Sequence, residues 1–249
     1  MKLQAVLFDL DNTLILFEEL VFFKHYSQKL YSVFADVMTP QEFSERLIRS
    51  TQMMVNNDGQ MTNAEYFIHD FARGTGVDER QLWQRFADFY DRQFEQFQSL
   101  MQPHADARQV MQFIQAKGLK TVIASNPMFP TNVQLMRLRW AGLGDLSFDL
   151  ITSADNTTYV KPRLEYYQQI CDKIQVPPAG CLMVGNDPFN DMIASKIGMK
   201  TYLTTDTNHL SIELSRELAK AANLEMPKPD FSGSLGQVMM VIDQLTDNE

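Results

Sequence analysis

The apolar positions of the chain fall into short continuous runs in some places and into a helical period in others. Residues 3–8 form an apolar run that stops at Asp9, which is typical of a strand buried on both faces in a parallel sheet. Similar runs predict further strands at residues 119–125, 148–153, 181–185 and 200–205. The intervening pattern predicts helices at residues 105–117, 130–141, 163–174, 188–197 and 234–245.

The region between the first two predicted strands has a different pattern. Residues 18–100 contain few Gly or Pro residues, and large apolar residues recur every three or four positions, which predicts three or four helices and no strand. Thr39 followed by Pro40 is typical of a helix start. Residues 56–59 and 74–76 have the composition of turns. Most aromatic residues of this region are expected to form its core, because they recur at helical spacing.

Strands that alternate with helices of ten or more residues predict βαβ units and a parallel sheet. We therefore predict a doubly wound α/β core that comprises residues 1–16 and 101–249, with a helical domain inserted at residues 17–100. Residues 206–226 are predicted to form a helical appendage before the last strand and helix.

Composition and charge narrow the class of protein. The 249 residues are 45% hydrophobic, which is enough for a sizeable core. Acidic residues exceed basic ones by 31 to 22, and the net charge of −9 leads us to expect no binding of nucleic acid polymers or of an anionic membrane surface. No apolar run approaches the ~20 residues that span a bilayer, and Asp9 and Asp11 interrupt what would be a signal peptide. Two cysteines, Cys171 and Cys181, suit reduced thiols, so we expect a cytoplasmic protein.

Polar residues follow the predicted strands at the ends where open parallel sheets bind ligands. They are, in chain order, Asp9 and Asp11, Ser125 and Asn126, Lys161, and Asp187 and Asp191. Taken alone, each position has a commoner structural interpretation, as a turn residue, a helix cap or a solvated side chain before a helix. Independent structural roles do not explain an acid, a hydroxyl, a lysine and an acid in this order, so the joint pattern indicates one site.

These positions resemble the four motifs of the haloacid dehalogenase superfamily, in its phosphatase branch. Residues 8–14 (FDLDNTL) resemble the first motif, hhhDxDxT, and Ser125 ends a predicted strand as in the second motif. Lys161 before Pro162 resembles the third motif, and residues 185–191 (GNDPFND) resemble the acidic fourth motif. The inserted helices match the position and type of the family's small helical cap. The resemblance implies a Rossmannoid α/β core with that cap.

The resemblance also implies a role for each residue of the first three motifs. Asp9 would be the nucleophile and would form an aspartyl-phosphate, and Asp11 would protonate the leaving oxygen and then activate water. Ser125 and Lys161 would hold the oxygens of the transferring phosphoryl group, with Asn126 beside them. Because dehalogenases of the superfamily lack the second acid of the first motif, Asp11 argues for a phosphatase rather than a dehalogenase.

The implied cofactor is Mg²⁺, which offsets the repulsion between a carboxylate and a phosphate. Its expected ligands are Asp9, the backbone carbonyl of Asp11, Asp187 and, through water, Asp191, which alternatively orients the lysine of the third motif. Two registers are possible for the fourth motif. We prefer the register in which Asp187 and Asp191 keep the DxxxD spacing; in the alternative, Asn186 replaces the first acid and leaves a weaker metal site.

We therefore expect a Mg²⁺-dependent phosphatase that hydrolyses a small phosphorylated metabolite, such as a sugar phosphate, a phosphoglycolate-like acid or a nucleoside monophosphate. A phosphomutase has the same two acids and remains an alternative. A non-catalytic protein that binds phosphorylated metabolites is a further alternative, although such a protein could lose a member of the catalytic set without consequence. The sequence makes no prediction of the oligomeric state.

Overall fold

A computed structural model describes residues 2–207 and 226–247. The helical appendage predicted for residues 206–226 lies almost entirely outside the described residues. No helix within these two ranges is long and apolar enough to cross a membrane.

The core is built on a six-stranded parallel sheet with the order β5-β4-β1-β6-β7-β8. The strands are β1 (Ala5–Phe8), β4 (Lys120–Ile123), β5 (Leu150–Ile151), β6 (Cys181–Gly185), β7 (Lys200–Thr204) and β8 (Phe231–Gly233). The predicted α/β fold with a doubly wound parallel sheet is confirmed. Strand β1 lies in the interior of the sheet, between β4 and β6, which explains why its four residues are all buried and apolar.

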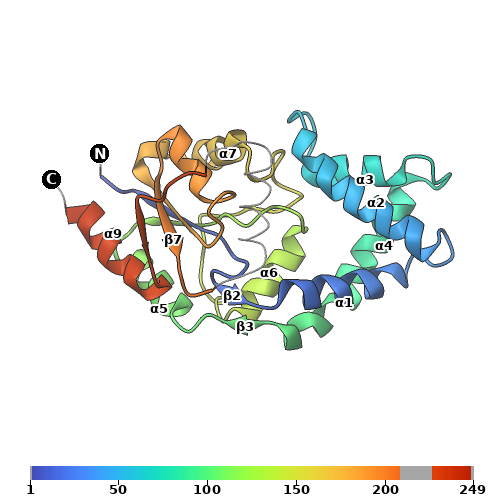
Figure 1. Ribbon diagram of the computed structural model, residues 1–249, viewed down its shortest axis with the longest axis horizontal. Coiled ribbons are helices and arrows are strands. Elements are labelled where there is room, and N and C mark those ends of the chain that lie inside the picture. Colours follow the sequence, from blue (N-terminus) through green and yellow to red (C-terminus); the bar gives the residue numbers. More distant parts are fainter. Residues whose placement is uncertain (1, 208–225, 248–249) are drawn as a thin grey trace.

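Helices cover both faces of this sheet (Figure 1). Val6 and Phe8 of β1 face the side covered by α5 (Ala107–Ala116) and α9 (Val238–Asp247), whereas Ala5 and Leu7 face the side covered by α7 (Leu164–Ile174). This division follows from the alternation of side chains along a strand.

The prediction of a helix at residues 188–197 is wrong for the first half of that range. Those residues form a turn, and a 3-10 helix follows only at Met192–Ile197. The Asp187 carboxylate accepts hydrogen bonds from the backbone N–H groups of Phe189 (2.8 Å) and Asn190 (2.9 Å), which holds the chain in the turn.

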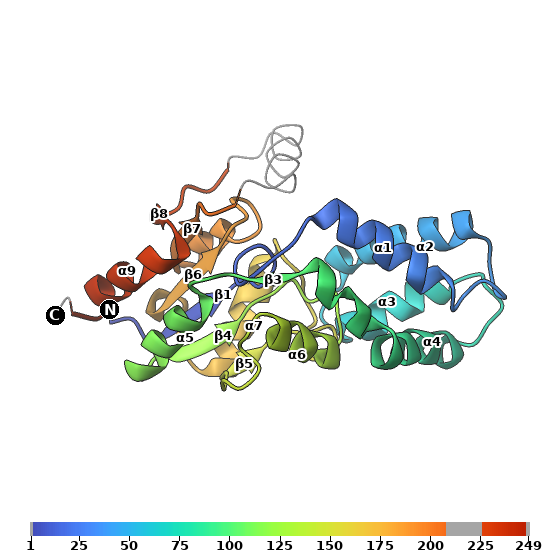
Figure 2. The same cartoon turned by 90° about the horizontal axis from the view of Figure 1, so that it is seen from below.

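The inserted segment of residues 17–100, which we call the cap, is helical. It contains α1 (Glu19–Tyr31), α2 (Pro40–Met53), α3 (Asn63–Ala72), α4 (Glu79–Arg92) and a 3-10 segment at Phe94–Leu100. Figures 1 and 2 show the cap at the end of the core opposite to the two termini. Helix α2 begins as predicted, with Pro40 in its first turn and the Thr39 hydroxyl accepting from the Glu42 N–H (3.3 Å).

Rings fill the interior of the cap, as predicted from their spacing. Phe34 and Phe86 lie 4.8 Å apart between ring centroids, and both pack on Phe71; all three are buried. A second group around Phe22 extends to Phe129 of the core, which therefore joins the two parts through aromatic contacts.

Polar contacts and a short β-ribbon also attach the cap to the core. The chain enters the cap through β2 (Ile15–Leu16) and leaves it through β3 (Gln102–Pro103), and these strands pair as a two-stranded antiparallel ribbon. This ribbon was not predicted, because two-residue strands leave no periodic signal. At the other side, the Asn63 amide donates to the Thr157 hydroxyl (3.1 Å) of the core.

Candidate active site

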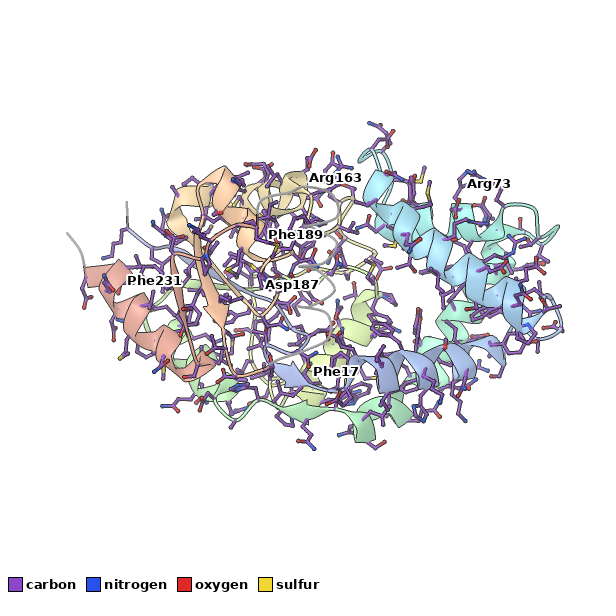
Figure 3. The ribbon with its side chains drawn as sticks, viewed as in Figure 1. Phe17, Arg73, Arg163, Asp187, Phe189 and Phe231 are labelled. Carbon is purple, nitrogen blue, oxygen red and sulfur yellow. The ribbon has the colours of Figure 1, made fainter. Side chains whose placement is uncertain are left out.

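The predicted site residues meet at the carboxyl edge of the sheet. Asp9 follows β1, and its backbone N–H donates to Val184 O of the neighbouring strand β6 (2.9 Å). Ser125 follows β4 on the other side of β1. Because the chain runs from β1 to strands on both sides, this edge is the point where the strand order reverses, the usual place for a ligand in such sheets. Figure 3 shows Asp187 in the part of the core nearest to the cap, with Phe17 of the cap close to it.

Lys161 connects two of the acids. Its Nζ donates to Asp9 Oδ1 (2.8 Å) and to Asp191 Oδ1 (2.6 Å), and the lysine is only 4% exposed. Burial alone would lower the pKa of Lys161, but the carboxylates of Asp191 and Asp9 outweigh it and hold the pKa above its usual value. The lysine is therefore a fixed positive charge beside Asp9. Gly185 leaves room for this arrangement, since a Cβ there would overlap the Asp191 carboxylate.

Ser125 and Asn126 lie at the end of β4, beside this ion pair. The Ser125 hydroxyl is buried and makes no hydrogen bond with any residue of the described ranges. The backbone of Ser125 is fixed, because its carbonyl accepts from the hydroxyls of Thr152 (2.8 Å) and Tyr166 (2.8 Å). The side-chain oxygen of Asn126 accepts from the backbone N–H of Lys161 (3.2 Å), and this bond links the second and third motifs. A buried hydroxyl without a partner is a donor ready for a ligand oxygen.

Asp11 has a partner that the sequence analysis missed. Its carboxylate contacts the guanidinium of Arg137, which comes from α6 (Thr131–Trp140) and is 1% exposed. Burial lowers the pKa of Arg137 to about 10, against the opposing effect of Asp9. The guanidinium also lies over the Phe129 ring, 5.3 Å from its centroid. The available signal was a charged residue in register with buried Val133, four positions earlier on the same helix.

Asn12 is a second residue that was not singled out. Its φ of 55° lies in the left-handed region, which Asn tolerates better than most residues. Its side chain accepts from the Phe17 N–H (3.0 Å) and donates to Glu19 (3.0 Å) at the start of α1. Asn12 thus joins the loop that carries Asp9 and Asp11 to the first helix of the cap.

The fourth-motif loop lies against the first motif. Asn186 is buried, and its side-chain oxygen accepts from the Thr13 hydroxyl (3.3 Å). The Asp187 carboxylate accepts from its own turn, including the Asn190 amide (2.9 Å). These contacts favour Asn186 as the residue that faces the first motif. The register in which Asp187 heads the metal site stays a prediction.

The residues present suit a Mg²⁺ ion bound through few protein ligands. Within the described ranges, no group of three or more His, Cys, Asp or Glu side chains is arranged to hold a metal. Mg²⁺ commonly takes one or two carboxylates and completes its shell with waters and phosphate oxygens. Asp9 and the oxygen-bearing side chains of the fourth-motif loop supply such a set, because the contact between Thr13 and Asn186 brings the two loops together.

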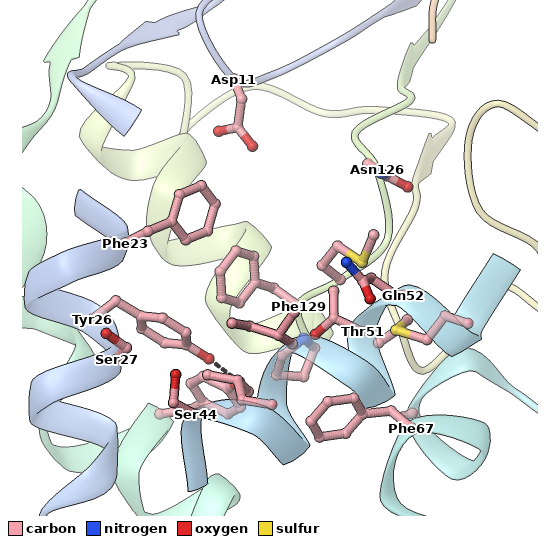
Figure 4. Close-up of a pocket in the computed structure, with 18 of the residues that line it drawn as sticks. Asp11, Phe23, Tyr26, Ser27, Ser44, Thr51, Gln52, Phe67, Asn126 and Phe129 are labelled. Carbon is pink, nitrogen blue, oxygen red and sulfur yellow. Dashed lines mark hydrogen bonds between the residues drawn. The ribbon is translucent and has the colours of Figure 1, made fainter. Parts of the chain in front are cut away.

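A cavity of about 530 Å³ lies between this edge and the cap. Asp11, Asn126 and a few apolar residues such as Phe129 line it from the core, and residues of all four cap helices line most of the remainder. Figure 4 shows Asp11 and Asn126 at one end, with Tyr26, Ser44 and Phe67 of the cap at the other. A volume of this size suits a small organic molecule.

Comparisons with known proteins show the family of the chain. A model of the haloacid dehalogenase-like hydrolase family matches residues 3–197, so the chain belongs to that family and is a hydrolase by family membership. A curated relative, pyrophosphatase PpaX of Bacillus cereus, is 24% identical over 232 residues, which cover 93% of this chain and 92% of the relative.

Solved structures show the same fold. A predicted phosphoglycolate phosphatase from Haemophilus somnus aligns with a TM-score of 0.57 and 16% identity, over 97% of this chain and 98% of that chain. The L-2-haloacid dehalogenase from Xanthobacter autotrophicus aligns with a TM-score of 0.54 and 21% identity, over 96% of this chain and 98% of that chain. Since the fold carries both phosphatases and dehalogenases, the reaction has to be argued from the site.

Proposed function

We propose that the protein is a Mg²⁺-dependent phosphatase that hydrolyses a small phosphomonoester through an aspartyl-phosphate on Asp9. The observation that supports this most is the placement of Asp9 beside the buried Lys161 ammonium, with the unpartnered Ser125 hydroxyl at the end of the neighbouring strand. A phosphate bound there would receive a positive charge and a hydroxyl donor at the carboxylate that attacks it.

In the first step, an Asp9 oxygen forms a bond to phosphorus, and the bond between phosphorus and the ester oxygen breaks. The electron pair of that bond stays on the ester oxygen, which takes a proton from Asp11 and leaves as an alcohol. In the second step, water attacks phosphorus and gives a proton to Asp11, and the bond between Asp9 and phosphorus breaks. The products are the alcohol and inorganic phosphate, and both acids return to their starting forms.

Arg137 would act as a positioning residue in this scheme. Because its guanidinium is buried and contacts the Asp11 carboxylate, it limits the orientations available to the acid that must reach the ester oxygen. Asp9 and either Asn186 or Asp187 would hold Mg²⁺. When bound, the ion would offset part of the negative charge shared by Asp9 and the phosphate.

The test is a phosphatase assay on a generic substrate, p-nitrophenyl phosphate, with and without Mg²⁺. We expect turnover that requires Mg²⁺ and is abolished in Asp9→Asn, because the amide keeps the size of the side chain but is not a nucleophile. Acid quenching during turnover, followed by peptide mass spectrometry, should locate a phosphoryl group on Asp9. Thermal unfolding of the variant serves as the control for an intact fold.

Four other outcomes would contradict the proposal. Full activity in EDTA, or substantial activity of Asp9→Asn, would exclude the assigned site. Transfer of phosphate within a sugar phosphate without release of inorganic phosphate would identify a phosphomutase. Halide release from a 2-haloacid, with no phosphate release from any monoester, would identify a dehalogenase.

A further inference from the structure

The wall of the cavity between the cap and the core is almost free of charge. Of the residues that line it in the described ranges, Asp11 alone is ionisable near neutral pH, and none is Lys, Arg or His. The remaining polar side chains are hydroxyls and amides, such as Thr51 and Gln52. The apolar lining includes Phe23, Ile48 and Phe67 from the cap.

The two tyrosines of the wall also present carbon rather than polar atoms. The hydroxyls of Tyr26 and Tyr90 bond to each other over 2.8 Å, and both residues are buried. Burial raises the pKa of Tyr26 well above its usual value and that of Tyr90 to about 12, so both stay neutral. One hydroxyl of the pair donates and the other accepts, so each has a partner within the wall.

Two large apolar side chains of this wall are left in contact with water. Phe23 of α1 is 52% exposed and Ile48 of α2 is 55% exposed, and both line the cavity. Contact between this apolar surface and water is unfavourable. Binding of an apolar ligand that covers the surface is therefore favoured in proportion to the area removed from water. Asp11 and Asn126 of the proposed catalytic site line the core end of the same cavity.

We infer that the substrate is a phosphomonoester of an apolar alcohol, either an alkyl chain of medium length or an aromatic alcohol, whose organic part fills this cavity. The inference rests on the proposed phosphatase function and specifies its substrate class. It departs from the sugar phosphates, phosphoglycolate-like acids and nucleoside monophosphates expected from the sequence.

The same wall disfavours substrates with a second anionic group. The carboxylate of phosphoglycolate or the second phosphate of pyrophosphate would enter a cavity with no cationic side chain in the described part of its wall. An anion that loses its water without gaining a partner is strongly destabilised. The inferred substrate therefore differs from pyrophosphate and phosphoglycolate, the substrates that the names of two similar proteins indicate for those proteins.

The first experiment measures kcat/KM for methyl, butyl and hexyl phosphate, with phosphoglycolate and pyrophosphate as anionic comparisons. The unbranched alcohols of butyl and hexyl phosphate are equally good leaving groups, so a difference between the two substrates reports burial. We expect a rise of about fourfold for each methylene that the cavity covers. Hydrolysis of phosphoglycolate and pyrophosphate should be slower than that of hexyl phosphate.

A pair of matched variants tests the cavity wall. Gln52→Arg places a guanidinium at the wall, whereas Gln41→Arg makes the same change on the same helix at an exposed position that does not line the cavity. We expect Gln52→Arg to shift the ratio of kcat/KM for phosphoglycolate over hexyl phosphate upward by about tenfold or more. Gln41→Arg should leave that ratio at the wild-type value.

Calorimetric binding of butyl and hexyl phosphonate, which have no ester bond to hydrolyse, separates this inference from the proposed function. If no monoester is turned over but affinity rises with chain length, the phosphatase proposal fails and the apolar cavity stands. Should monoesters be turned over while neither kcat/KM nor phosphonate affinity depends on chain length, the substrate inference is wrong. A preference for phosphoglycolate or pyrophosphate in the wild type would also overturn it.

Discussion

The catalytic edge of the core and the wall of the cap cavity are built on opposite principles. At the edge, a few charged groups are buried and satisfied by one another, as Lys161 is by Asp9 and Asp191. In the cap wall, many uncharged side chains from four helices share one surface, and its polar contacts, such as the hydrogen bond between Tyr26 and Tyr90, join neutral groups.

This difference teaches how the two regions respond to change. Removing one partner of a buried charge cluster leaves an uncompensated charge, which costs far more than the loss of a contact. In a wall made of many apolar contacts, the loss of one contact lowers the free energy of unfolding only slightly. The core edge is therefore expected to tolerate almost no substitution, and the cap wall to tolerate many.

The largest effect is expected for Lys161→Met. The change leaves the Asp9 and Asp191 carboxylates buried together without their cation, so we expect a loss of ~3–5 kcal/mol in the free energy of unfolding. Turnover should also be lost, because the charge that would hold the phosphate is gone. Urea denaturation and p-nitrophenyl phosphate hydrolysis measure the two effects.

The control is the double variant Lys161→Met/Asp191→Asn. It removes one of the two carboxylates that Lys161 balances, so it should recover part of the lost stability while remaining inactive. If Lys161→Met is as stable as the wild type, the buried ion pairs do not behave as a unit. The expected difference in sensitivity between the core edge and the cap wall would then disappear.

A smaller effect is expected at the fourth motif, where Asn186 contacts Thr13. We expect Asn186→Ala to raise the Mg²⁺ concentration needed for half-maximal activity by about 10–100-fold, the usual effect of losing a group that supports a metal site. Asp187→Ala removes the acceptor of the following turn and should mainly lower stability. Titration of activity with Mg²⁺ for both variants decides between the registers. A larger Mg²⁺ requirement in Asp187→Ala would restore the register preferred from spacing.

The smallest of these effects concerns the tyrosine pair of the cap. Tyr26→Phe leaves the Tyr90 hydroxyl buried without its partner and should cost about 1–3 kcal/mol of unfolding free energy, measured by denaturation. In Tyr26→Phe/Tyr90→Phe, both polar groups are absent and stability should return close to the wild type. If the double variant is less stable than the single one, the cost does not come from an unpaired buried hydroxyl, and this prediction is wrong.

The same contrast explains what the sequence could predict. The sheet follows from apolar runs such as residues 3–8, and Asp9 and Lys161 follow from their positions after strands together with the family resemblance. Each of these signals is local in the chain. The roles of these residues stay predictions, but their convergence at one edge is a consequence of parallel strands.

Other features depend on contacts between distant segments and left no local signal. Arg137 contacts Asp11 only because α6 packs beside the first motif; its register with Val133 indicates a buried position but not which residue it contacts. The charge-free wall of the cavity arises from four helices that each look like ordinary amphipathic helices. The shortening of the helix expected at residues 188–197 has a local cause instead, because the Asp187 side chain accepts from the backbone N–H groups of the residues that follow it.

The ribbon of β2 and β3 makes the cap an exchangeable module. Leu16 and Gln102 are register partners across the ribbon, so the two points where the chain leaves and re-enters the core are adjacent in space. An insertion whose ends lie side by side can be lengthened, replaced or shortened to a turn without altering the strand order of the host. Evolution can therefore change what such an enzyme recognises by replacing one continuous segment, while the loops that carry the chemistry are inherited unchanged.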